Sequence, residues 1–292
     1  MTASTALARL RDVVARHDSA LVTFSGGVDS ALVVAVAHEV LGDRAVALTA
    51  DSPTFPPEEL ALARDIAQQV GIRHVVVDSA ELEREGYAAN AGDRCYFCKS
   101  ELFDLAFDQA ASLGLAAVFD GTITDDLGEH RPGLQASAER RVLHPLVEAG
   151  FDKAAVRDAA KSLGLPVWDK PAFACLGSRF PVGTRVTAER VKMVSRVESL
   201  LRQLGFTQFR VRYHRVDDAP LARIELAPSE LPHLVQEGLR DTVLARCLEE
   251  GFQWVTLDLA GYVRGGLSVA PSASATAPAT PAPQHARPSS GS

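Results

Sequence analysis

The sequence lacks the features of a membrane or secreted protein. No apolar stretch approaches the roughly 20 residues of a membrane span, and the N-terminus has neither the basic region nor the apolar run of a secretory signal. We therefore expect a cytoplasmic protein with no membrane role. Positive charge is also scarce, because 30 Lys and Arg stand against 37 Asp and Glu, a net charge of -7 in 292 residues. This balance argues against a general nucleic-acid binder, whose field must attract phosphates.

Basic residues nevertheless gather in one stretch of the chain. Between Arg179 and Arg223 ten Lys and Arg residues stand against four Asp and Glu residues, a local net charge of +6. An anionic ligand is expected there.

Cysteine is rare, with four residues in the chain. A disulfide framework is not expected in a cytosolic chain of this size. Cys95 and Cys98 form a Cys-x-x-Cys pair, Cys175 lies far downstream, and Cys247 lies in a helical-looking apolar stretch that belongs to the core. The first three therefore suggest chemistry.

Strand-like and helix-like segments alternate over the first part of the chain. The expected strands are 20–24, 46–49, 74–77 and 116–119, and the expected helices are 7–15, 31–40, 56–70, 102–112 and 152–162. This order predicts an α/β fold, a parallel sheet with helices on both faces and a ligand site beyond the carboxyl ends of the strands. Ser25, Asp51, Asp78 and Asp120 follow those ends and should mark one rim.

Three regions are predicted. Residues 1–185 form the nucleotide-binding domain, and 186–267 form a smaller α+β domain with a helix at 187–204 and strands at 208–213 and 221–226. Residues 268–292 are mostly Ala, Pro, Ser and Thr, which bury too little apolar surface to fold, so a disordered tail is expected.

A glycine loop follows the first expected strand. In Ser25-Gly26-Gly27-Val28-Asp29-Ser30, backbone N–H groups and the start of a helix can bind phosphate. The Walker A lysine and the third glycine of the dinucleotide fingerprint are both absent. The loop resembles the signature of PP-loop ATP pyrophosphatases, which implies binding of ATP and transfer of AMP to a carboxylate or carbonyl oxygen. Asp29 would help to hold Mg²⁺.

The cysteine pair is a weak signal alone, shared by zinc sites, redox pairs and iron–sulfur clusters, and two unconnected thiols are also possible. If Cys175 joins Cys95 and Cys98, three thiolates can hold three irons of a [4Fe–4S] cluster and leave the fourth iron open for sulfide.

Several motifs together resemble the LarE family of ATP-dependent sulfur transferases over about residues 5–265. They are the segment from Trp168 to Arg179, Asp120-Gly121-Thr122, Asp125-Asp126 and Arg131-Pro132-Gly133. The resemblance implies conversion of both carboxylates of pyridinium-3,5-dicarboxylic acid mononucleotide to thiocarboxylates for the nickel-pincer nucleotide cofactor, in a homo-oligomer.

The family's sulfur-donor cysteine corresponds to Cys175. In one version of the family's chemistry this cysteine gives up its own sulfur and becomes dehydroalanine. In the other, three cysteines carry a cluster that hands over a bound sulfide. Because Cys95 and Cys98 are present, the sequence favours the cluster.

The remaining polar candidates concern anionic groups. Arg210 and Arg212 alternate on an expected strand and could grip the mononucleotide phosphate, as the family resemblance implies, with Glu198 from the preceding helix. Ser178 and Arg179 would contact the adenylate. Asp51 and Asp126 are added to the nucleotide site, Lys99 is a weaker candidate, and His38 and His144 are expected to be structural.

Three alternatives stay open at this point. A tRNA-thiolating PP-loop enzyme would also use cysteines and the basic stretch, but no RNA-binding appendage is recognisable. An ammonia-dependent ligase of the NAD-synthetase type leaves three cysteines unexplained. A non-catalytic nucleotide sensor or cluster carrier would not turn over ATP.

Overall fold

The computed structural model describes residues 3–128, 132–171 and 174–263. The predicted tail, 268–292, lies outside the described residues, as do Arg131, Ala172 and Phe173 of the motifs named above.

Four parallel strands form the sheet of the N-terminal unit. They are β1 (Ala20–Thr23), β2 (Ala45–Asp51), β3 (Arg73–Asp78) and β4 (Ala117–Phe119), in the spatial order β3-β2-β1-β4. β1 pairs with β2 and β4, and β2 pairs with β3. The predicted parallel α/β sheet is confirmed.

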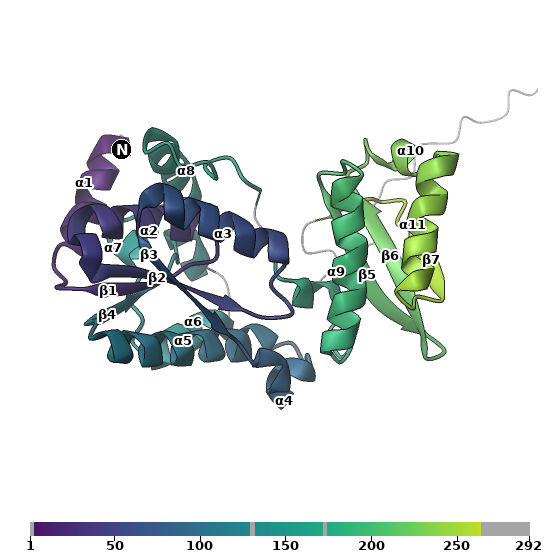
Figure 1. The fold of residues 1–292 in the computed structure, drawn as a ribbon, viewed down its shortest axis with the longest axis horizontal. Coiled ribbons are helices and arrows are strands. Elements are labelled where there is room, and N and C mark those ends of the chain that lie inside the picture. Colours follow the sequence, from purple (N-terminus) through teal and green to yellow (C-terminus); the bar gives the residue numbers. More distant parts are fainter. Residues whose placement is uncertain (1–2, 129–131, 172–173, 264–292) are drawn as a thin grey trace, which may run out of the picture.

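Helices cover both faces of this sheet (Figure 1). They are α1 (Ala3–Val14), α2 (Val28–Leu41), α3 (Pro57–Val70), α4 (Glu85–Ala88), α5 (Arg94–Leu113), α6 (Pro132–Glu139), α7 (Pro145–Glu148) and α8 (Lys153–Ser162), with 3₁₀ helices η1 (Gly42–Arg44), η2 (Glu81–Glu83) and η3 (Thr124–Gly128). Successive strand residues point to opposite faces. Ala20 and Val22 accordingly pack with α1, α2 and α8. Leu21 packs with α5 through Phe103.

The C-terminal unit has its own three-stranded sheet. Its elements are η4 (Leu176–Arg179), α9 (Ala188–Gln203), β5 (Phe209–Val216), β6 (Ala219–Leu226), α10 (Leu231–Leu234), α11 (Glu237–Glu249) and β7 (Trp254–Leu257). β6 pairs antiparallel with β5 and parallel with β7. Val211, Tyr213 and Ile224 face a core that also contains Leu201 of α9 and Cys247 of α11. The core position expected for Cys247 is confirmed.

The two units meet next to Cys175. The Leu176 amide donates to the Thr54 carbonyl over 2.9 Å. Ser199 and Arg202 of α9 both donate to the Glu58 carboxylate in the first turn of α3. The boundary predicted at residue 185 stays a prediction, because the second core also takes in Leu176 and Phe180.

Within the described parts of the chain, no helix is both long enough and apolar enough to cross a membrane.

Candidate active site

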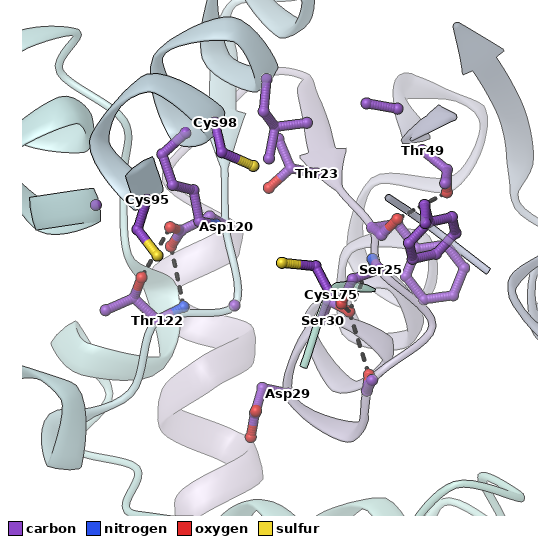
Figure 2. Close-up of a pocket in the computed structure, with 18 of the residues that line it drawn as sticks. Thr23, Ser25, Asp29, Ser30, Thr49, Cys95, Cys98, Asp120, Thr122 and Cys175 are labelled. Atoms are coloured by element: carbon purple, nitrogen blue, oxygen red, sulfur yellow. Dashed lines mark hydrogen bonds between the residues drawn. The ribbon is translucent and has the colours of Figure 1, made fainter. Parts of the chain in front are cut away.

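A cavity of about 730 Å³ lies where the strands β1, β2 and β4 end. Ligands of open parallel sheets bind at this edge, because the loops that follow the strands diverge there. The cavity is lined by the glycine loop, by both cysteine motifs and by Asp120 and Asp126 (Figure 2). The structure thus brings together segments that are far apart in the chain.

The glycine loop is held by its own serines. The Ser30 hydroxyl accepts from the Ser25 amide over 3.3 Å and donates to the Gly27 carbonyl over 3.1 Å. Gly26 has φ of +68°, and a Cβ there would lie 3.3 Å from Cβ of Ala63. Gly27 provides no side-chain cap for α2, and the first residues of that helix line the cavity. Such uncapped N–H groups bind phosphate oxygens.

Two lysines that sequence reasoning missed flank this loop. Lys153, at the start of α8, donates to both Asp29 carboxylate oxygens over 2.6 and 2.8 Å. Lys170 contacts Glu59 over 2.5 Å and lies 3.5 Å from the Gly26 carbonyl oxygen. Both lysines line the cavity. Positive charge therefore surrounds the position that the phosphates of ATP would take, and no spacing in the sequence links either lysine to the loop.

The three predicted thiols open on the same cavity. Cys95 and Cys98 lie in the first two turns of α5, and Cys175 precedes η4. In Figure 2 the sulfur atoms of Cys98 and Cys175 point into the space between them. Burial raises the pKa of the Cys175 thiol, against the lowering effect of the Arg94 charge. Burial and the nearby Glu81 carboxylate raise the pKa of Cys98 well above its usual value.

The fit of these residues to a metal cluster is incomplete. Among the residues described, no three His, Cys, Asp or Glu side chains are grouped closely enough to hold a metal ion. The three thiols share a cavity wall but are not assembled as a ligand set. The cluster therefore stays a prediction.

Glu81 is a further cavity residue that the sequence did not point to. It begins η2, is only 4% exposed, and lines the cavity. Its carboxylate accepts from the hydroxyls of Ser52, over 2.8 Å, and of Thr54. A buried carboxylate beside the reactive cysteines must have a physical reason.

The other predicted nucleotide-site residues divide into two groups. Asp126 lines the cavity and accepts from the Ile123 amide over 3.0 Å. Asp51, Ser178 and Arg179 are not among the described residues that line it, although Ala50, Ser52 and Cys175 are. The Asp51 carbonyl accepts from the Ser79 amide. His144 has a partner that spacing did not suggest, since Nδ1 lies 2.7 Å from the Asp120 carboxylate.

Arg179 and Glu198 form a buried bidentate ion pair, with N–O distances of 2.9 and 2.8 Å. The guanidinium also donates to the Ala174 and Cys175 carbonyls, and Glu198 accepts from the Val211 amide. As placed, both side chains join the Cys175 segment to the C-terminal unit. Their predicted contacts with adenylate and phosphate stay predictions.

Arg210 and Arg212 share one face of β5 but have different surroundings. Arg212 is 5% exposed, donates to the Ser178 carbonyl, and pairs with Glu225 over 2.8 Å. Arg210 is half-buried, donates to its own Phe209 carbonyl, and lies 4.9 Å from the Tyr262 ring centre. Burial and the charge of Arg179 lower the pKa of Arg210. A bound anion would relieve this repulsion.

Substituting Glu198 with alanine is expected to destabilise the protein by about 3–5 kcal/mol, because it leaves the buried Arg179 charge without its partner. Urea unfolding measures the loss. The matched control is Glu85→Ala, which removes an exposed partner of Arg185 and should leave the unfolding curve unchanged. Equal, small effects of both substitutions would contradict this role of the pair.

Comparisons with known proteins agree with the site. The Asparagine synthase family model matches residues 7–127. The chain is 47% identical over 262 residues to an uncharacterized protein of Synechocystis sp., covering 90% of this chain and 96% of that protein. It is 36% identical over 266 residues to the pyridinium-3,5-bisthiocarboxylic acid mononucleotide synthase of Lactiplantibacillus plantarum, covering 91% and 93%. It is also 26% identical over 215 residues to a glutamine-hydrolyzing GMP synthase protein of Archaeoglobus fulgidus, covering 68% of each.

Proposed function

The chain belongs to the LarE family of ATP-dependent sulfur transferases, and we propose that its acceptor is pyridinium-3,5-dicarboxylic acid mononucleotide, whose carboxylates it converts to thiocarboxylates. One observation carries the proposal. The phosphate-binding loop and Cys175 line a single cavity. Activation of a carboxylate and its attack by sulfur can therefore take place in one enclosure.

The first step is adenylylation. The triphosphate of ATP lies on the loop amides between Lys153 and Lys170, and the substrate carboxylate attacks the α-phosphorus while pyrophosphate leaves. A carboxylate is a poor electrophile, and its acyl phosphate is a good one. The cationic surroundings of the loop stabilise the charge that develops on the phosphates. Mg²⁺, a hard cation suited to carboxylate and phosphate oxygens, would be held by Asp29.

The second step is sulfur transfer from the Cys175 site. The Cys175 thiolate attacks the acyl carbon, AMP leaves, and a thioester forms. Loss of the Cα proton of Cys175 with cleavage of its Cβ–S bond then releases the thiocarboxylate and leaves dehydroalanine. The Arg94 charge, which lowers the pKa of this thiol against the effect of burial, supports thiolate formation.

A cluster is the second candidate for the sulfur source. Its support is that Cys95, Cys98 and Cys175 all line the cavity. They would be the ligands of three irons, and the cluster would supply a bound sulfide. The described thiols are not grouped as a metal site, so the reaction steps above run through the Cys175 thiol alone.

The substrate phosphate is proposed to bind at Arg210, which has no acidic partner in the described residues, with Arg212 held beside it by Glu225. Replacing Arg210 with alanine should raise KM for the mononucleotide about 10- to 100-fold, since a charge-assisted contact contributes about 1.5–3 kcal/mol. KM for ATP should not change. Steady-state kinetics with each substrate varied in turn measures the effect, and Arg215→Ala, an exposed arginine further along β5, is the control. Equal changes in both KM values would contradict this assignment.

The proposed reaction is tested by incubating the protein with ATP, Mg²⁺ and the mononucleotide. AMP, pyrophosphate and a thiocarboxylate that mass spectrometry detects should appear together. ATP cleavage that depends on ammonia, or tight and salt-sensitive tRNA binding, would instead support the ligase or the tRNA-thiolating enzyme.

We further propose a cytoplasmic homo-oligomer that binds no nucleic acid. Exposed apolar side chains on the C-terminal unit support self-association: Val216, Val235, Leu244, Leu248, Trp254 and Leu259 are each more than 40% exposed. The net charge of -7 supports the absence of nucleic acid.

A further inference from the structure

Glu81 carries a buried negative charge that lacks a cationic partner. It takes part in no ion pair among the residues that the structure describes, and its carboxylate accepts only from uncharged donors: the hydroxyls of Ser52 and Thr54 and the Cys98 thiol. Desolvating a carboxylate costs several kcal/mol unless an opposite charge compensates it. The cavity therefore contains an anion whose counter-charge is not supplied by the described side chains.

The nearest positive side chains have other partners. Arg94 donates to the Asn90 side chain over 2.7 Å. The Lys99 ammonium lies 5.2 Å from the centre of the Phe103 ring. Lys153 and Lys170 pair with Asp29 and Glu59 around the glycine loop. The cavity is thus cationic around the loop and anionic at Glu81.

Glu81 is also tied to the segment that delivers sulfur. Thr54 donates to Glu81 through its hydroxyl and accepts from the Leu176 amide through its carbonyl. Leu176 follows Cys175 directly. A ring whose carboxylate is attacked from Cys175 therefore comes close to Glu81.

We infer that Glu81 recognises the positive charge of the pyridinium ring and so makes the enzyme specific for an N-alkylated, cationic ring. This inference rests on the proposed function and adds a specificity-determining residue to it. Ring charge is the property that separates the substrate from its reduced 1,4-dihydropyridine form, which has the same ribose, phosphate and carboxylates. A carboxylate in a low-dielectric cavity distinguishes the two forms through charge alone.

The test measures dissociation constants for both forms of pyridinium-3,5-dicarboxylic acid mononucleotide by titration calorimetry, without ATP turnover. Wild-type protein should prefer the oxidised form. Glu81→Gln keeps an oxygen that can accept from Ser52 and Thr54 but removes the charge. It should weaken binding of the oxidised form about tenfold or more. Binding of the reduced form and of ATP should be unchanged.

Two further variants make the result specific. Glu83→Gln removes an exposed charge from the same short helix and should behave as wild type. Glu81→Asp keeps the charge and should keep the preference, which also covers the case in which Glu81→Gln folds poorly in thermal unfolding. Equal weakening of both forms by Glu81→Gln, or a preference that survives it, would overturn the inference alone. Wild-type protein that binds neither form would overturn the proposed function as well.

Discussion

Replacing Cys175 with alanine is expected to lower thiocarboxylate formation by at least about 1,000-fold, because the substitution removes the attacking sulfur itself. Mononucleotide-dependent exchange of pyrophosphate into ATP should continue at a rate near that of wild type, since the glycine loop and its lysines are unchanged. Mass spectrometry of the product and isotope exchange measure the two steps separately. Sulfur transfer that persists in this variant would show that Cys175 is not the donor site.

Cys95→Ala is the companion variant, because Cys95 is exposed and its substitution leaves the core intact. If the Cys175 thiol is the sulfur source, Cys95→Ala should complete a single turnover, and the spent wild-type protein should carry dehydroalanine at position 175. If a cluster is the source, anaerobically purified wild type should contain iron and sulfide, and Cys95→Ala should lose both iron and transfer.

Replacing Asp29 with alanine is expected to slow AMP formation about 100- to 1,000-fold, because the metal that neutralises the triphosphate loses a protein ligand. The same substitution leaves the Lys153 ammonium without its partner, so ATP binding itself should weaken less than the rate. Pyrophosphate exchange measured against Mg²⁺ concentration gives both quantities, and a raised Mg²⁺ requirement is expected.

The control for this prediction is Asp43→Ala. Asp43 is an exposed aspartate in the short helix that follows α2, away from the cavity, and its loss should change neither rate nor Mg²⁺ dependence. An Asp29→Ala enzyme with the Mg²⁺ dependence of wild type would assign the metal to other ligands.

The fold of the N-terminal unit follows from local sequence. The apolar strand before Ser25 and the Pro57 start and Gly71 stop of α3 are signals that depend on neighbouring residues alone, and the structure has them. The first turns of α5 were not expected, because Cys, Tyr and Phe have modest helix propensity. Packing of Phe103 and Ala106 against the sheet stabilises this helix, and no short window of sequence contains that contact.

The site shows the same division. The loop and the thiols could be found because each lies in a compact motif. Lys153 and Glu81 could not, since a single Lys or Glu on a helix is usually a solvated charge. Each enters the site through partners far along the chain, Asp29 in one case and Thr54 in the other. Such pairings depend on how the sheet is assembled, which periodicity does not encode.

The shared cavity has a consequence for side reactions. An acyl adenylate is unstable to water, and an enzyme that released it would lose ATP to futile hydrolysis. Because the loop that forms the adenylate and the cysteine that consumes it line the same walls, the intermediate has no diffusive step between the two. The ratio of AMP to thiocarboxylate produced should therefore lie near one, and it reports how well the protein excludes solvent during its turnover.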